Sequence, residues 1–412
     1  MTKKSDAPAI RFKGFSDAWE QRKFEEIAVR SSVICSDDTL PRVEYEDIVS
    51  GTGRLNKDIY AKQSIKSGIA FHQGDVLYGK LRPYLQNWLL PTFDGLAVGD
   101  FWVLQPQNAD SSFLYRLIQS RQFDEVANQS TGTKMPRADW KLVSKTVFSI
   151  PSNISEQAAI GTYFTALDSL ITLHQRKFEK LTNVKKSMLE KMFPQNGSSY
   201  PEIRFKGFTD PWEQRKFDEV FDCTIPNNTL SRAELNYESG SVRNIHYGDI
   251  LIKYGSIVDV QNDEIPFATG KSSDDFKGAL LQDGDIIIAD TAEDETTGKA
   301  CEIGNSQGLD VVSGLHTMVC RPRNKMALGY LGYYLNSDAY HHQLLPLMQG
   351  IKVLSLSRTN VQKTMVCYPK SKAEQQLIAD CFRNLDTLIT LHQRELEKLQ
   401  NIKKSMLEKM FV

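Results

Sequence analysis

Two stretches of the chain carry apolar side chains in alternating steps of four and three residues. In the first stretch these positions are Ile160, Phe164, Leu167, Ile171, His174, Phe178, Leu181, Lys185, Met188 and Met192. In the second they are Ile378, Phe382, Leu385, Ile389, His392, Leu396, Leu399, Lys403, Met406 and Met410. This spacing predicts two helices, each about 50 Å long, that pair through a coiled-coil seam. We expect the pairing to be antiparallel.

The rest of the chain has short apolar runs separated by glycine and aspartate turns. The runs that predict strands are 76–78, 102–104, 147–150, 250–252, 286–289, 318–320 and 365–368. Short helices are expected at 113–119 and 327–335. This mixture predicts domains of the α/β or α+β class, and the pattern does not decide between the two.

The sequence contains an internal duplication, seen in two pairs of similar segments. Residues 11–24 read RFKGFSDAWEQRKF and residues 204–217 read RFKGFTDPWEQRKF. Residues 168–193 and 386–411 form a second pair, in which five of 26 positions differ. The stretches between these repeats diverge almost completely. Near-identical repeated segments around divergent stretches indicate one task performed on two different targets. The duplication also predicts a pseudo-twofold relation between the halves.

We expect four segments. The first variable domain covers 1–153 with its constant box at 11–24, and the first long helix covers 154–193. The second variable domain covers 194–371 with its box at 204–217, and the second helix covers 372–412. A length of 412 residues agrees with more than one domain.

Charge alone does not identify a nucleic-acid binder here, because the net charge is −1. Any DNA contact must come from locally concentrated lysine and arginine. No apolar run reaches the length of a membrane span, and we see no signal peptide. The six cysteines are scattered and form no Cys-x-x-Cys pair. This usage fits reduced thiols in a cytoplasm.

The sequence offers little catalytic chemistry. The segment ending in Thr297-Gly298-Lys299 lacks the first glycine and the final hydroxyl of a nucleotide-binding loop. A glycine-rich cofactor loop with an Asn/Asp-Pro-Pro-aromatic motif, as in base methyltransferases, is absent from the sequence. The acidic residues Asp290, Glu293, Asp294 and Glu295 follow an apolar strand. They are consistent with a Mg²⁺ site, with a solvated turn, or with acceptors for cytosine amino groups.

Two histidines, His174 and His392, occupy matching seam positions. They are consistent with a pH switch or a metal clip. We favour the alternative, a polar pair that fixes the helix register.

Several loops carry the side chains that read DNA, because lysine and arginine suit phosphate and guanine while asparagine and glutamine suit adenine. We expect DNA contacts from Lys80, Arg82, Tyr84, Lys134 and Arg137 in the first domain and from Lys253, Tyr254, Lys299, His316 and Lys352 in the second. The match of Lys253 with Lys80, each after an expected strand, and of Lys352 with Lys134 at the helix repeat's offset supports this choice.

In this order of boxes, domains and helices, the chain resembles the specificity subunits of type I restriction-modification systems. The motifs that carry the resemblance include residues 74–84 (GDVLYGKLRPY), 132–137 (GTKMPR), 248–251 (GDIL), 284–287 (GDII) and 314–317 (GLHT). The resemblance covers essentially the whole chain. It implies two target recognition domains held apart by two conserved helices.

The resemblance also implies a function. Each domain would read one half of a split, asymmetric target in double-stranded DNA, and the helices would dock two methyltransferase subunits, with restriction subunits added. No metal or cofactor is expected on this chain, whereas S-adenosylmethionine, ATP and Mg²⁺ would belong to the partner subunits. The alternatives are a self-contained nuclease built around Asp290 and Glu293, and a scaffold whose variable domains bind proteins.

Overall fold

The computed structural model describes residues 8–61, 64–129 and 135–411. The chain divides into two compact units. Unit 1 comprises Met1–Arg176 together with Gln393–Val412, and unit 2 comprises Lys177–His392. Each unit therefore contains one variable domain and a part of each long helix. The boundaries predicted for the four segments differ from this division and stay a prediction.

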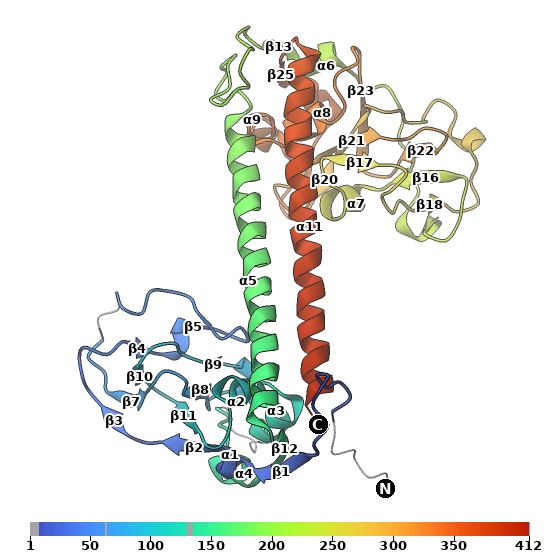
Figure 1. Cartoon of the computed structure of the whole chain (residues 1–412). Coiled ribbons are helices and arrows are strands. Elements are labelled where there is room, and N and C mark those ends of the chain that lie inside the picture. Colours follow the sequence, from blue (N-terminus) through green and yellow to red (C-terminus); the bar gives the residue numbers. More distant parts are fainter. Residues whose placement is uncertain (1–7, 62–63, 130–134, 412) are drawn as a thin grey trace. The chain divides into compact units, whose positions relative to one another are not determined.

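The two long helices are α5 (Ile154–Lys191) and α11 (Lys372–Met410). In unit 1, Phe164 lies against Phe411 with ring centroids 6.4 Å apart, and Asp168 lies 2.7 Å from Lys403. Phe411 directly follows α11. Because Lys403 and Phe411 run in the opposite order to Phe164 and Asp168 of α5, the two segments are antiparallel (Figure 1). The predicted antiparallel pairing is confirmed.

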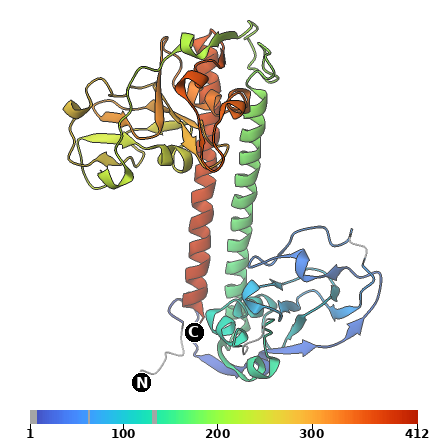
Figure 2. The ribbon, with the colours of Figure 1, turned by 180° about the vertical axis from the view of Figure 1, so that it is seen from behind.

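Unit 2 pairs the other segments of the same helices in the same way (Figure 2). Phe193 stacks on Phe382 at 5.8 Å, and Lys185 forms an ion pair with Asp386. Asp168 and Asp386 occupy equivalent positions of the sequence repeat, and so do Lys185 and Lys403. One and the same Asp–Lys contact is therefore made once in each unit.

Unit 1 holds its variable domain in short strands. They are β1 (Trp19–Lys23), β2 (Ala28–Ser31), β3 (Ile34–Cys35), β4 (Arg42–Val43), β5 (Ile48–Val49), β6 (Arg54–Leu55), β7 (Gly68–Phe71), β8 (Val76–Gly79), β9 (Trp88–Leu89), β10 (Gly95–Ala97), β11 (Phe101–Pro106) and β12 (Val147–Pro151). The short helices are α1 (Phe24–Ile27), α2 (Ser111–Leu117), α3 (Arg121–Ala127) and α4 (Trp140–Lys145). Two sheets have the strand orders β3-β7-β10-β4 and β2-β11-β8-β9, and β1 pairs with β12.

Unit 2 repeats much of this plan. Its strands are β13 (Glu213–Lys216), β14 (Phe221–Asp222), β15 (Leu235–Asn236), β16 (Val242–Ile245), β17 (Ile257–Asp259), β18 (Phe267–Ala268), β19 (Ile286–Ala289), β20 (Thr291–Ala292), β21 (Ala300–Gly304), β22 (Asp310–Ser313), β23 (Thr317–Pro322), β24 (Leu354–Ser355) and β25 (Met365–Tyr368). Its short helices are α6 (Phe217–Val220), α7 (Tyr247–Ile252), α8 (Tyr330–Leu335), α9 (Asp338–His341) and α10 (Arg358–Val361). The two larger sheets run β14-β23-β19-β21-β17 and β15-β18-β16-β22.

Most of these strand pairings are antiparallel; β4 with β10, β16 with β22 and β17 with β21 are parallel. This arrangement decides the open question of class in favour of α+β, since a doubly wound sheet would be mainly parallel. Six of the seven predicted strands and both predicted short helices are confirmed. The strand predicted at 250–252 is wrong, because these residues end helix α7.

Each constant box is bound to the start of a long helix by the same contacts. In unit 1 the Arg11 guanidinium donates to Glu156 at 2.6 and 2.7 Å, and the Trp19 indole donates to the same carboxylate at 3.3 Å. In unit 2 the equivalent residues Arg204 and Trp212 donate to Glu374 at 2.7, 3.0 and 3.3 Å. Both carboxylates are buried. The repeated sequence thus encodes a repeated docking contact.

Among the described residues, no helix is both long enough and apolar enough to cross a membrane.

Candidate DNA interface

Two of the loops singled out in the first domain lie side by side in unit 1. The amide of Arg82 donates to the carbonyl of Pro136 at 2.7 Å, and the amide of Ala138 donates to the carbonyl of Lys80 at 2.8 Å. The strand ends β8 and β11 and the loop before α4 therefore form one continuous surface. It brings together Lys80, Arg82 and Arg137 from separate parts of the sequence.

The Asp100 carboxylate joins two of these cations. It lies 3.4 Å from the Lys80 Nζ and 3.0 Å from the Arg137 Nη2. Burial by itself would raise the pKa of Asp100, but the hydrogen bond from Arg137 and the two positive charges outweigh it and lower that pKa. The acid stays ionised and orients both cations, which remain partly exposed.

The loop between β8 and β9 is strained on both sides of an exposed aromatic ring. Arg82 and Gln86 have φ values of 49° and 55°, in the left-handed region that such residues rarely adopt. Between them the Tyr84 side chain is exposed. Backbone strain of this kind concentrates at functional sites. Lys134 lies outside the described residues, and its DNA contact stays a prediction.

The second domain corrects the reasoning about Lys253 and Tyr254. Lys253 follows helix α7, not a strand, so its match with Lys80 is wrong. Its ammonium lies 2.7 Å from Glu264 and 4.7 Å from the centre of the Tyr237 ring. Tyr254 is only 4% exposed, and its hydroxyl donates to the Glu264 carbonyl at 3.3 Å. We therefore assign Tyr254 to packing and no longer to the DNA surface.

Lys299 has a structural contact that the sequence did not indicate. Its Nζ donates to the carbonyls of Leu251 and Tyr254 at 3.0 and 3.1 Å, at the end of α7. Burial lowers the pKa of this lysine. Carbonyls at a helix C-terminus lack partners within the helix and favour a cation. A DNA contact by Lys299 would require both bonds to break.

His316 and Lys352 are exposed. His316 has a φ of 54°, its Nδ1 lies 3.5 Å from an Asp290 oxygen, and its ring meets Tyr247 edge-on at 5.3 Å. Lys352 lies in the loop before β24. Both residues are accessible to a large ligand, and their contact with DNA stays a prediction.

Asp290 and Asp294, two of the acidic residues after β19, have different partners. Asp290 accepts a hydrogen bond from Thr291 at 2.8 Å, whereas the Asp294 backbone and side chain organise the turn to Thr297. In the described part of the chain, no group of three or more His, Cys, Asp or Glu side chains is placed to hold a metal ion. The His341 Nε2 donates a hydrogen bond to the Glu295 carbonyl at 2.8 Å, so this ring has a structural partner.

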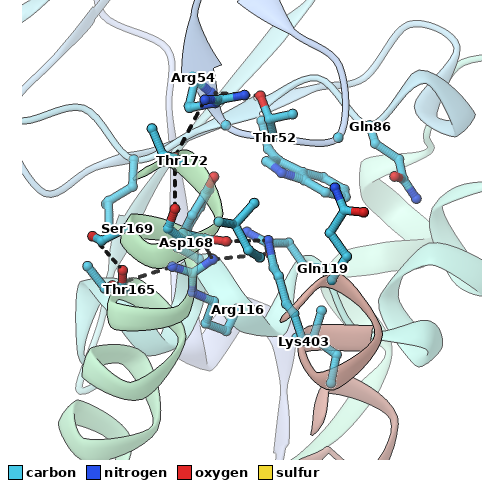
Figure 3. A pocket seen from close by; sticks show the side chains of 18 of the residues that line it. Thr52, Arg54, Gln86, Arg116, Gln119, Thr165, Asp168, Ser169, Thr172 and Lys403 are labelled. Carbon is cyan, nitrogen blue, oxygen red and sulfur yellow. Dashed lines mark hydrogen bonds and ion pairs between the residues drawn. The ribbon is translucent and has the colours of Figure 1, made fainter. Parts of the chain in front are cut away.

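Unit 1 also contains a cavity of about 1060 Å³ beside the strained loop (Figure 3). On its wall, Asp168 of α5 accepts from Arg116 of α2 and from Lys403 of α11, each at 2.7 Å. Arg54 reaches the same wall and donates to Gln175 at 2.9 Å. Sequence reasoning missed this charged network. One indication was present, because Lys403 and its repeat Lys185 are the charged exceptions in an apolar seam.

The comparison with protein families identifies the fold's biological context. The model of the type I restriction modification DNA specificity domain matches the chain twice, at residues 32–183 and 209–401. The chain belongs to this family. As a specificity chain of a type I restriction-modification system, it acts in the recognition of DNA sequence.

Similar proteins agree with this assignment. The chain is 22% identical over 346 residues to the type I restriction enzyme MjaVIII specificity subunit of Methanocaldococcus jannaschii, covering 78% of the specificity chain and 77% of the relative. A solved type I restriction-modification S subunit from M. genitalium shares its fold at a TM-score of 0.57 and 14% identity, with 98% and 99% of the two chains covered. A chain from a solved type I system assembly gives a TM-score of 0.51 at 16% identity, with 94% and 96% covered.

Proposed function

We propose that this chain reads a split, asymmetric DNA target, with unit 1 reading one half and unit 2 the other. The observation that carries the proposal is that the contacts between box and helix are the same in both units, whereas the variable loops differ. The Arg–Trp–Glu contacts that bind each box to its helix are the same in both units. The loops beyond these contacts differ in sequence and in surface chemistry, as expected of two readers with different targets.

The same proposal includes docking of two methyltransferase subunits on the long helices, with restriction subunits added to the complex. Outside the seam, α5 exposes Leu170 and Leu173, and α11 exposes Leu388 and Leu391. These leucines are repeat equivalents. Exposed apolar residues of this spacing on a helix are typical of a surface that another protein covers. Their duplication supports two copies of one partner.

We also propose that the chain is not itself a catalyst and acts in the cytoplasm, where it meets DNA. S-adenosylmethionine, ATP and Mg²⁺ would then be bound by the partner subunits. The partners of Lys299 and Asp294 support this proposal, because both side chains have structural contacts within unit 2.

A domain exchange tests the proposal. Residues 25–150 are replaced by the matching stretch of a relative, and the complex with its methyltransferase subunits is expressed in a host. Sequencing of modified bases in host DNA should show a new sequence in one half of the methylated target and the parental sequence in the other. A change in both halves would contradict independent reading. DNA cleavage by the purified chain alone would favour the nuclease alternative, and methylation without sequence preference would favour the scaffold.

A further inference from the structure

The two units share an equivalent turn and strand pairing. Matching their lysines in the sequence does not reveal it. Gly74 and Gly284 both have a φ of 92°, and each precedes an aspartate whose side chain accepts a backbone amide at 2.9 Å. The strands β8 and β19 follow these turns. Each pairs antiparallel with the next long strand, Gly79 opposite Phe101 in unit 1 and Ala289 opposite Thr317 in unit 2.

This register makes Asp290 the counterpart of Lys80, and His316 the counterpart of Asp100. An equivalent backbone hydrogen bond confirms the match. The Lys80 amide donates to the Asp100 carbonyl at 2.9 Å, and the Asp290 amide donates to the His316 carbonyl at 3.1 Å. In each unit a third segment binds next to this strand pair. The Ala138 amide donates to the Lys80 carbonyl at 2.8 Å, and the Leu356 amide donates to the Asp290 carbonyl at 2.8 Å.

We call this place the strand-end site. It consists of Lys80, Asp100 and Arg137 in unit 1, and of Asp290, His316 and Ser355 in unit 2. The backbone is equivalent in the two units, but the side-chain chemistry is inverted. Unit 1 presents two cations oriented by a carboxylate, whereas unit 2 presents a carboxylate at the first position.

The environment of Asp290 keeps its carboxylate oriented and accessible. Its Oδ1 accepts from the Thr291 hydroxyl at 2.8 Å and lies 3.5 Å from the His316 Nδ1. The Asp290 side chain is 24% exposed and that of His316 is 48% exposed. The Tyr247 ring supports the imidazole from one side. In contrast to Tyr254, these groups face the surface.

We infer that the strand-end site determines one base of each half-target, a guanine read by Lys80 and Arg137 in unit 1 and a cytosine read by Asp290 in unit 2. This inference rests on the proposed function. Lysine and arginine donate to the O6 and N7 acceptors of guanine, and a carboxylate accepts from the N4 amino group of cytosine. Because the two backbones are equivalent, a difference in preferred base must come from these side chains.

The test compares Asp290→Asn with the parent in the full chain, coexpressed with its methyltransferase subunits. Asparagine has both a donor and an acceptor and suits adenine. We expect the preference for cytosine at one position of the second half-target to fall by roughly 5- to 150-fold, with the first half unchanged. Lys80→Gln and Arg137→Gln should relax a guanine position in the first half only. Asp274→Asn, at an exposed acid of unit 2, is the matched control.

The possible outcomes distinguish a failure of the proposed function from a failure of the base assignment at the strand-end site. If the parent complex methylates no defined sequence, the proposed function fails and this inference fails with it. If the parent has a split target and Asp290→Asn leaves its second half unchanged, only the inference is overturned. A uniform loss of methylation at every position, with the parental melting temperature, would also overturn it, because loss of a base contact relaxes one position and does not weaken all sequences alike. A single relaxed position in the expected half supports it.

Discussion

At the scale of single residues, Glu302 is an ionisable group in the interior of unit 2. Its side chain is fully buried, and it accepts a hydrogen bond from the Gly332 amide of α8 at 2.8 Å. Burial raises the pKa of Glu302 to about 7, although the backbone amides of α8 and the charge of Arg383 oppose the shift. An ordinary glutamate in the unfolded chain titrates near 4.5. The folded state therefore holds a proton that the unfolded state releases.

This difference predicts how stability depends on pH. The contribution of Glu302 is fully present below about pH 4.5 and is lost as the pH rises through about 7. Glu302→Gln cannot ionise and so does not lose this contribution. From pH 5 to pH 8, the free energy of unfolding of the variant should therefore rise by about 1–3 kcal/mol relative to that of the parent. Denaturant unfolding at both pH values measures the change, with the exposed Glu238→Gln as control. Equal pH dependence in Glu302→Gln and the parent would contradict the prediction.

Residue by residue, the sequence located the candidate surface better than it identified its members. The Lys80 and Arg137 loops were recognised from their composition, and the structure brings them together around Asp100. Asp100 itself was missed, because nothing local in the sequence links it to either loop. Lys299 and Tyr254 have the right chemistry for DNA, but their contacts at the end of α7 depend on tertiary structure.

At the scale of elements, the contact between box and helix has two matched copies that serve as each other's control. Glu156→Gln removes the charge that holds Arg11, and a hydrogen bond to a charged group contributes roughly 1.5–3 kcal/mol. We expect faster amide hydrogen exchange in β1 and β12 of unit 1, with β13 and β25 unchanged. Glu374→Gln should give the mirror result in unit 2. Exchange that rises equally in both units for either variant would contradict local docking.

The exposed leucines of the helices give a second prediction at this scale. Leu170→Ser combined with Leu173→Ser should weaken binding of a methyltransferase subunit by at least about tenfold, because each buried leucine contributes roughly 1.5–3 kcal/mol. The melting temperature should change little, since these side chains lie outside the seam. Binding is measured by titration of purified subunits. Ile351→Ser, at an exposed residue of a loop in unit 2, is the control. Because the equivalent leucines of α11 remain, parental affinity together with the parental number of bound subunits in the double variant would exclude this surface.

Elements were predictable where the sequence pattern was long. Nine seam positions within α5 and ten within α11 define one helical period. Three apolar residues at 250–252 define no period, and a run this short fits a buried strand or a helix equally well. The side chain of His246 accepts from the Gly248 amide at 3.2 Å and begins α7. A histidine cap is not among the usual start signals of a helix.

At the scale of the whole molecule, duplication separates what is constant from what is specific. The Asp–Lys pairs of the helices and the Arg–Trp–Glu contacts of the boxes recur with the same partners in both units. The strand-end sites keep the backbone and exchange the side chains. The sequence repeat predicted the constant part directly. It could not predict the counterpart of Lys80. The boxes repeat at an offset of 193 residues and the helices at 218, so the second variable stretch is 218 − 193 = 25 residues longer, and only the strand register restores the alignment.

The helices are also expected to determine the gap between the two half-targets, and the lengths involved make this testable. Half-sites read from one face of DNA lie about 34–36 Å apart. Helices of 38 and 39 residues are each about 57–59 Å long and can bridge this span with overlap. One heptad is inserted after Leu181 and one after Leu399, which keeps the seam in phase. Each helix then grows by about 10 Å, or about 3 base pairs.

The modified sequence should keep both half-targets and lengthen only the gap between them, as read from methylated bases in host DNA. Overall methylation is expected to fall, because three added base pairs also rotate one half-target around the duplex by nearly a third of a turn. Inserting three residues at each point is the control, since it breaks the seam and should abolish methylation without defining a new gap. Altered half-targets with an unchanged gap would mean that another part of the complex determines the distance.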